Sequence, residues 1–260
     1  MDTKRKIAIV TGASGGFGKE FVRLLAAKDG LDEIWTIARG EENLNRLRDE
    51  FGDIIKVIPM DLTDRNNYKI IADMLKENNV RVRYLINCAG FAKFCAYGDI
   101  DTDVSLNMID LNVGAAVALC LVCLPFMERG DRIINISSQA SFQPLPFQNI
   151  YGATKVFLRH YTRALNVELE DRGITAIAVC PGWMSTGLYE RACIGAKRGT
   201  NKFVDMHEPD VVAQKAVKDA DAGKSMSVYG LYTKFTHVAS KILPQSLVMK
   251  LWLLQQKINV

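Results

Sequence analysis

The chain has 260 residues, of which 48% are hydrophobic and 24% charged, and its formal net charge is +4. This length suits one large α/β domain with a substantial core, and the composition is ordinary for a globular protein. The basic residues form no concentrated block, which argues against a nucleic-acid-binding protein. The N-terminal apolar segment is too short for the core of a signal peptide, and six cysteines without disulfide spacing indicate a reducing cytoplasm.

The chain begins with a continuous apolar strand at residues 6–10, a glycine-rich turn at residues 11–18 and an amphipathic helix. An unbroken apolar run is typical of a buried parallel strand. Glycines let the backbone approach a pyrophosphate, and the N-terminus of the next helix offers free N–H groups and a positive dipole end. The turn is therefore a candidate phosphate-binding loop, with a plain structural turn as the alternative.

The second strand, expected at residues 33–38, leads directly into Arg39. NAD-binding units usually carry Asp or Glu at this place, whereas an arginine accommodates the extra phosphate of NADP, so Arg39 favours NADP(H). A helix at residues 42–51 and a third strand at residues 54–60 are expected next. Asp61, at the end of that strand, is a candidate acceptor for the adenine amino group or a capping residue.

The middle of the chain predicts a helix at residues 65–78, a strand at residues 84–87 and a long helix at residues 102–127. The apolar run at residues 113–127 is shorter than the roughly 18 residues that a membrane span needs, so we expect a buried or subunit-interface helix. Asn112 in this helix needs a partner, because a buried unpaired amide costs about 1–3 kcal/mol. It either caps a local kink beside Gly114 or holds a water next to Lys155.

Cys120 and Cys123 form a CxxC pair inside the same apolar helix. No second pair and no nearby histidines accompany them, so core packing is favoured over a zinc or redox site. We expect no metal site.

Ser138, Tyr151 and Lys155 form the most informative stretch of the chain. The strand expected at residues 132–137 ends just before the serine, and a helix runs from Tyr151 to about residue 172. Residues four apart lie on one helix face, so the lysine ammonium lies beside the phenol and should lower its pKa from about 10. The serine hydroxyl can fix a carbonyl or alcohol oxygen against the tyrosine. The three predict a site that moves one proton on and off an oxygen, although a Tyr-x-x-x-Lys pair alone usually marks a solvated helix face.

Strands at residues 174–180 and 225–229 complete the alternation of strands and helices. No linker or change in composition divides residues 1–260. We therefore predict one doubly wound α/β (Rossmann) domain, with a parallel sheet of about seven strands and helices on both faces. Ligands bind such sheets at the carboxyl ends of the strands, where all the candidate groups lie.

Six motifs in register, over roughly residues 5–190, together resemble the short-chain dehydrogenase/reductase family, and Arg39 resembles the 2′-phosphate ligand of its NADP-preferring members. They are Thr11-Gly-Ala-Ser-Gly-Gly-Phe-Gly18, Asn87-Cys-Ala-Gly90, Asn112, Ser138, Tyr151-Gly-Ala-Thr-Lys155 and Pro181-Gly182 through Thr186. The resemblance implies hydride transfer between a nicotinamide ring and a carbonyl carbon, with Tyr151 as acid/base.

The resemblance also assigns roles to the other residues. Lys155 lowers the pKa of Tyr151 and holds the nicotinamide ribose, Ser138 positions the substrate oxygen, and Asn112 keeps a proton-relay water. The implied contacts to NADP(H) come from Gly12, Ser14, Gly16, Phe17, Gly18, Arg39, Asp61, Leu62, Asn87, Ala89, Gly90, Tyr151, Lys155, Pro181, Gly182 and Thr186.

Apolar and aromatic residues from three loops surround the expected substrate position, which favours a bulky, apolar ketone or alcohol such as a steroid or bile acid. They are Phe91, Phe94, Phe142, Leu145, Pro146, Phe147, Trp183, Met184, Leu188 and Tyr189. Residues 183–207 are expected to form the substrate flap. Residues 231–260 predict two amphipathic helices broken at Pro244, as a lid or subunit contact in preference to a membrane contact.

Two alternatives remain open. A 3-oxoacyl reductase would favour basic residues at the cleft mouth, for which Arg191, Lys197, Arg198 and Lys202 are candidates. A non-catalytic NADP-sensing protein is disfavoured because the tyrosine and lysine are both present. Family members commonly form homodimers or homotetramers, so we expect one of these.

Overall fold

The computed structural model describes residues 4–196, 198–200 and 202–258. It contains a seven-stranded sheet in the order β3-β2-β1-β4-β5-β6-β7, and all six pairings are parallel. The predicted doubly wound fold is confirmed. The strands are β1 (Arg5–Thr11), β2 (Glu33–Ala38), β3 (Ile55–Pro59), β4 (Val80–Asn87), β5 (Arg132–Ile136), β6 (Thr175–Val179) and β7 (Met226–Ser227).

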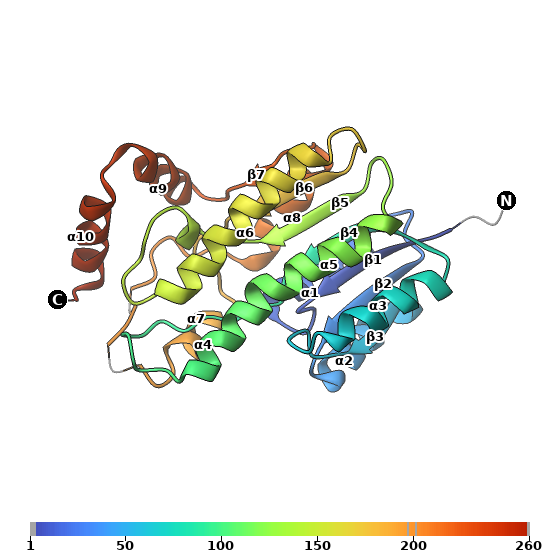
Figure 1. Cartoon of the computed structure of the whole chain (residues 1–260), viewed down its shortest axis with the longest axis horizontal. Helices are drawn as coiled ribbons and strands as arrows, with labels where there is room; N and C mark the ends of the chain where they lie inside the picture. The colour runs from blue at the N-terminus through green and yellow to red at the C-terminus, as the bar shows by residue number, and fades with distance from the viewer. Residues whose placement is uncertain (1–3, 197, 201, 259–260) are drawn as a thin grey trace.

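Helices cover both faces of this sheet (Figure 1). One face packs against α1 (Gly16–Ala26), α2 (Glu41–Phe51) and α8 (Pro209–Asp221), and the other packs against α3 (Asn66–Glu77), α5 (Ala116–Cys123) and α6 (Asn149–Glu168). Four further helices lie near the carboxyl edge or beyond it: α4 (Thr102–Ile109), α7 (Leu188–Cys193), α9 (Leu231–Ile242) and α10 (Gln245–Gln256).

The period-two geometry of β1 explains its unbroken apolar sequence. Ile7 and Ile9 face the core on the α3, α5 and α6 side, whereas Ala8 and Val10 face the core on the α1 and α8 side. All four are fully buried. Successive side chains point to opposite faces, so a strand covered on both sides must be apolar at every position.

The long helix expected at residues 102–127 is interrupted. The segment Asp110–Ala115 between α4 and α5 is π-helical, and a 3-10 turn at Leu124–Phe126 ends the run. Among the described residues, Thr102–Phe126 is the one helical run long and apolar enough to cross a membrane by length and composition. Leu119, Cys120 and Cys123 are fully buried against the sheet, so this run is a core helix of the fold.

Two strand boundaries differ from the prediction. β4 begins at Val80, four residues before the predicted start at residue 84, because its charged residues have partners: Arg81 and Arg83 both contact the buried carboxylate of Asp131. β7 contains two residues of the five predicted at residues 225–229.

The described cysteines are free, and no cluster of three or more metal-ligating side chains occurs among the described residues. Burial raises the pKa of the Cys120 thiol to about 11 and raises that of Cys123 as well. Both thiols are therefore protonated at neutral pH and pack as small apolar groups.

Candidate active site

A groove of about 670 Å³ runs along the carboxyl ends of β1, β2 and β4. The glycine-rich turn forms one wall, and the turn after β4 forms another. Eleven of the predicted cofactor residues line it: Gly12, Ser14, Gly16, Phe17, Gly18, Arg39, Asp61, Leu62, Ala89, Gly90 and Thr186.

The glycine-rich turn leaves the start of α1 open. Gly15 is the N-cap, no side chain caps the helix, and its first turn holds no acidic residue. The first backbone N–H groups therefore remain available to an anion, and the dipole favours negative charge there. A Cβ on Gly18 would lie 2.2 Å from the carbonyl oxygen of Gly12, so the turn cannot keep this shape with a larger residue. The turn fits a dinucleotide pyrophosphate.

Arg39 and Asp61 lie at the far end of the groove. Arg39 is exposed, and no salt bridge to it is formed among the described residues. Oδ1 of Asp61 accepts hydrogen bonds from the backbone N (2.9 Å) and the hydroxyl (2.8 Å) of Thr63. These bonds, the backbone one first, hold the pKa of the Asp61 carboxyl below its usual value. The groove thus ends in one cation that forms no salt bridge among the described residues and one ionised carboxylate, whose pKa the charge of Arg39 lowers further.

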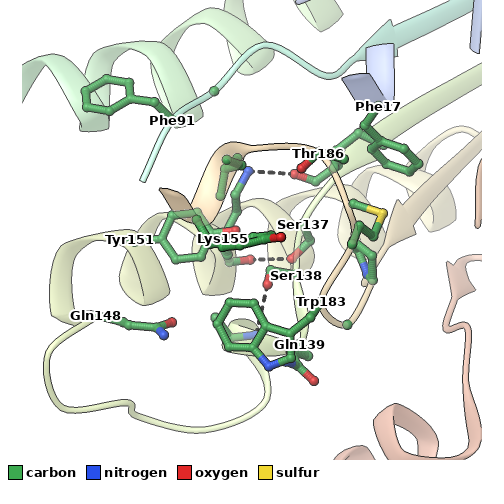
Figure 2. Close-up of a pocket in the computed structure, with 18 of the residues that line it drawn as sticks. Phe17, Phe91, Ser137, Ser138, Gln139, Gln148, Tyr151, Lys155, Trp183 and Thr186 are labelled. Atoms are coloured by element: carbon green, nitrogen blue, oxygen red, sulfur yellow. Dashed lines mark hydrogen bonds between the residues drawn. The ribbon is translucent and has the colours of Figure 1, made fainter. Parts of the chain in front are cut away.

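A smaller pocket of about 100 Å³ adjoins the groove and shares Phe17, Gly90 and Thr186 with it. Ser138, Tyr151 and Lys155 lie together in its wall, next to Ser137 (Figure 2). Pro181 and Gly182, from the turn after β6, line the same pocket.

Hydrogen bonds fix Lys155 and Ser138, the two outer members of this group of three. Lys155 Nζ donates to the carbonyl oxygen of Ile136 at 2.9 Å, and the Ser137 hydroxyl donates to the carbonyl oxygen of Lys155 at 2.8 Å. The hydroxyl of Ser138 accepts from the backbone N of Ala140 at 3.1 Å, which orients it at the start of the 3-10 turn Gln139–Ser141. Both Tyr151 and Lys155 are buried, with 8% and 6% of their surfaces exposed.

The expected lowering of the pKa of Tyr151 by Lys155 is not found. Burial raises the pKa of the phenol, and its hydrogen bond with Ser138 opposes the rise. Burial lowers the pKa of Lys155 to about 8. The ammonium lies 5.6 Å from the centre of the tyrosine ring, and desolvation outweighs its influence on the phenol. At neutral pH the phenol is therefore protonated and the lysine is mostly charged.

The amide of Asn112 is hydrogen-bonded to the backbone of Phe91 and to Thr154. Its Oδ1 accepts from the backbone N of Phe91 at 3.0 Å, and its Nδ2 donates to the Phe91 carbonyl at 2.9 Å and to the Thr154 hydroxyl at 3.2 Å. The expected kink is present as the π-helical turn around it. Asn112 thus fixes the turn after β4 against α6, and it lines neither the groove nor the pocket.

Asn87 is the second predicted residue that lies outside both cavities. Its Nδ2 donates to Oδ1 of Asn135 at 2.8 Å, and Nδ2 of Asn135 donates to the Thr162 hydroxyl at 2.9 Å. This side chain belongs to a buried polar network between β4, β5 and α6, and its expected contact with the cofactor stays a prediction.

Aromatic rings form a continuous chain from Tyr151 to the segment 183–207. Phe94 contacts Tyr151 at 5.5 Å between ring centres and Trp183 at 5.8 Å, and Phe203 contacts Trp183 at 4.8 Å and Tyr189 at 4.6 Å. Most of the apolar residues expected around the substrate line the pocket. Phe142, Pro146 and Phe147 do not line it, and Phe142 is instead buried against Ala178 and Cys180.

The comparisons with known proteins agree with this geometry. Residues 6–193 match the family model described as short chain dehydrogenase. The chain belongs to the short-chain dehydrogenase family. It is therefore an oxidoreductase of the type that uses a nicotinamide dinucleotide.

The relatives of this short-chain dehydrogenase are named after different substrates. The chain is 31% identical to sulfoacetaldehyde reductase 2 of Chromohalobacter salexigens, over 69% of this chain and 73% of that protein. It is 31% identical to hydroxysteroid dehydrogenase-like protein 1 of Gallus gallus, over 74% of this chain and 59% of that protein. A solved short-chain dehydrogenase from Sphingobium yanoikuyae, in complex with NADPH, is 27% identical, with a TM-score of 0.76 over 98% of this chain and 96% of that chain.

Sequence reasoning missed several residues of this short-chain dehydrogenase site. Asn43, Lys93 and Asn107 line the groove, and Ser137 and Gln148 line the pocket. Gln148 Nε2 donates to the hydroxyl of Thr200 at 2.8 Å, and both residues are buried. The signal for Ser137 was its place beside Ser138. The others carry no local signal, because helices and loops far apart in the sequence bring them together.

Proposed function

We propose that this short-chain dehydrogenase interconverts a bulky, apolar ketone and its secondary alcohol with NADP(H), using Tyr151 as proton donor and acceptor. The observation that carries the proposal is the buried set of Ser138, Tyr151 and Lys155 in an apolar pocket that adjoins the groove ending in Arg39. Such a set combines one proton donor, one orienting hydroxyl and one cation within a water-poor site.

In reduction, the Tyr151 hydroxyl gives its proton to the carbonyl oxygen, and in oxidation it takes the proton back. The raised pKa of Tyr151 keeps the phenol protonated at neutral pH, which is the form that a general acid requires. The Ser138 hydroxyl holds the substrate oxygen beside the phenol, and Lys155 holds the ribose of the cofactor. When bound, NADPH supplies the hydride that reduces the carbonyl carbon.

Arg39 supports the preference for NADP(H) over NAD(H). Arg39 comes directly after β2 and lies at the end of the groove. Its guanidinium has no salt-bridge partner among the described residues, so it can pair with a ribose 2′-phosphate. The Sphingobium yanoikuyae relative, which binds NADPH, supports the same preference by similarity.

The pocket lining supports a bulky, apolar substrate of the steroid or bile-acid kind. It includes Phe91, Phe94, Leu145, Trp183 and Leu188. Its volume of about 100 Å³ is below the roughly 300–1,000 Å³ of sites for drug-sized ligands, so such a substrate enters only when the flap at residues 183–207 moves.

The 3-oxoacyl reductase alternative has weaker support. Arg191 lines the groove, and the Arg198 guanidinium lies 5.8 Å from the ring of Phe147, so neither lines the apolar pocket. Lys197 lies outside the described residues. A non-catalytic NADP-sensing role is weaker still, because the whole catalytic set is present.

The proposal is tested by NADPH oxidation and NADP+ reduction against steroid, bile-acid, acyl and small ketones and alcohols, each with an NAD(H) control. We expect turnover with ring ketones or their alcohols. Turnover with acyl substrates alone would favour the 3-oxoacyl reductase, and cofactor binding without turnover would favour the sensing protein.

The cofactor preference has its own test in Arg39→Ala. Removing a charge-assisted contact costs about 1.5–3 kcal/mol, so the KM for NADPH should rise about 10- to 100-fold while the KM for NADH stays within a factor of about two. Arg48→Ala on α2 is the matched control, because Arg48 is exposed and lines neither the groove nor the pocket. An unchanged KM for NADPH in Arg39→Ala would contradict the assignment.

A further inference from the structure

Helix α9 packs with its polar side against the protein and presents its apolar side to solvent. Leu231, Phe235, Val238 and Ile242 recur every three to four residues, so they share one face, and between 54% and 84% of each side chain is exposed. The opposite face carries Thr233, Thr236, His237 and Ser240. Thr233 is fully buried, and the ring of His237 packs on Phe142 at 4.4 Å. This is the reverse of a surface helix in a globular protein.

Helix α10 repeats the exposed pattern at the same spacing. Leu247, Leu251 and Leu254 lie on one face, with 41% to 73% exposed. The opposite face holds α10 on the body of the protein, because Trp252 Nε1 donates to the carbonyl oxygen of Pro146 at 3.1 Å and Gln256 bonds the backbone of Lys202. The seven exposed residues on α9 and α10 are called the apolar stripe below.

The two helices form a hairpin at the end of the molecule opposite the N-terminus (Figure 1). Pro244 lies in the turn between them, and the side chains of Tyr232 and Gln255 are hydrogen-bonded where α9 begins and α10 ends. The apolar stripe is therefore carried by a braced hairpin rather than by a loose tail.

The charge of this part of the chain has one sign. No Asp or Glu follows Asp221, whereas the last 39 residues contain five lysines: Lys224, Lys234, Lys241, Lys250 and Lys257. Lys234 and Lys241 lie on α9 and Lys250 lies on α10, and all three are exposed. An exposed apolar stripe flanked by lysines, without carboxylates, matches the interface of an anionic lipid bilayer.

We propose that the α9–α10 hairpin docks the protein onto an anionic membrane surface, with the apolar stripe in the headgroup–acyl boundary and the lysines against lipid phosphates. A second copy of the chain fits the surface less well. A twofold contact through the hairpin would oppose lysines to lysines and bring no carboxylate from either hairpin to pair with them.

Docking would also set the substrate pocket close to the bilayer. Trp252 belongs to the same apolar cluster as Leu145, Tyr151 and Ala192. Under the proposed function, an apolar ketone could then reach the pocket from the lipid phase. Substrate entry from the lipid phase rests on the proposed function, whereas docking itself does not.

The test is flotation of the whole chain with vesicles of two compositions. One kind contains phosphatidylcholine alone, and the other contains phosphatidylcholine with about 30% phosphatidylglycerol. This anionic fraction gives the second kind a strong negative surface potential. We expect binding to the anionic vesicles and a loss of binding as salt rises to about 1 M, where the Debye length is about 3 Å. Phe235→Gln with Ile242→Gln should weaken binding about tenfold or more, because two side chains no longer enter the bilayer. Lys234→Glu with Lys241→Glu should abolish the preference for anionic vesicles.

Leu121→Gln with Val167→Gln is the matched control, because both side chains are 63% exposed and lie on α5 and α6, away from the hairpin. It should bind vesicles as the wild type does. Absence of wild-type binding, equal binding to neutral vesicles, or equal loss in the control variant would overturn the proposal. A dimer in sedimentation that Phe235→Gln with Ile242→Gln dissociates, without vesicle binding, would assign the stripe to a subunit interface instead. Because the readout is binding, it stays separate from any failure to find a substrate.

Discussion

Lys155 is the residue whose energetics bear most directly on the site. The fold buries its ammonium and gives it one backbone carbonyl, that of Ile136, as hydrogen-bond partner. Desolvation therefore lowers its pKa to about 8. A ribose hydroxyl of the cofactor would place a second oxygen next to the Lys155 ammonium. That contact would offset part of the free energy that burying the charge costs.

The cost of burying Lys155 should be visible as pH-dependent stability. Its pKa is about 8 in the folded chain and near 10.5 when unfolded, so between these values the unfolded state binds more protons and stability rises with pH. At 1.36 kcal/mol for each pKa unit, the full cost, present below pH 8, is about 3 kcal/mol. We predict that Lys155→Met removes this dependence.

Urea unfolding of wild type and Lys155→Met from pH 7 to pH 10.5, without cofactor, measures the effect. As pH rises, the free energy of unfolding of the wild type should increase relative to that of the variant. Lys69→Met, an exposed lysine on α3, should keep the wild-type pH dependence. If the free energies of unfolding of the wild type and Lys155→Met changed in parallel with pH, the claim that Lys155 is a buried, destabilising cation would be wrong.

Among the elements, the turn after β4 depends on the π-helical segment between α4 and α5. The wider turn at Asp110–Ala115 carries Asn112, and the Asn112 amide bonds both the N–H and the carbonyl of Phe91. π-turns inside helices often occur at functional sites. Here the turn supports the wall shared by the groove and the pocket.

Asn112→Ala should therefore weaken both stability and substrate binding. It leaves two backbone groups of Phe91 without a partner, and each costs about 1–3 kcal/mol, so we expect a loss of about 2–4 kcal/mol in the free energy of unfolding. The KM for the carbonyl substrate should rise as Phe91 loses its anchor. Chemical denaturation and steady-state kinetics measure the two effects, and Asn107→Ala, an exposed residue of α4, is the stability control. A loss in free energy of unfolding no larger than that of Asn107→Ala would contradict the role of Asn112 as the anchor of Phe91.

The C-terminal helices show where pattern reasoning reaches its limit. Their number and the break at Pro244 were predicted, because the apolar period and the proline are both local signals. The apolar period defines a face but not its partner. A lid or subunit contact was favoured because few charges flank the apolar segment. Only the packed structure reveals that α9 turns its polar side inward.

Across the whole molecule, the fold and the placement of Ser138, Tyr151 and Lys155 in one pocket were predictable for a common reason. Alternating buried strands and amphipathic helices determine a parallel sheet, and the motif residues follow the strand ends where ligands bind. Three features were not predictable. The charged start of β4 depends on the distant Asp131, Asn87 turns toward Asn135, and the pKa of Tyr151 depends on burial, which sequence spacing does not report.

The measurement that tests the account most directly is turnover by Tyr151→Phe together with its affinity for NADPH. The change removes one hydroxyl from the buried site, so NADPH should bind within about threefold of wild type. Ketone reduction should fall by about 10²- to 10⁴-fold, the usual contribution of general acid catalysis. Tyr161→Phe, the same change on the same helix but outside the pocket, should keep wild-type activity. Tyr151→Phe with near wild-type turnover would contradict the central claim that this phenol supplies the proton.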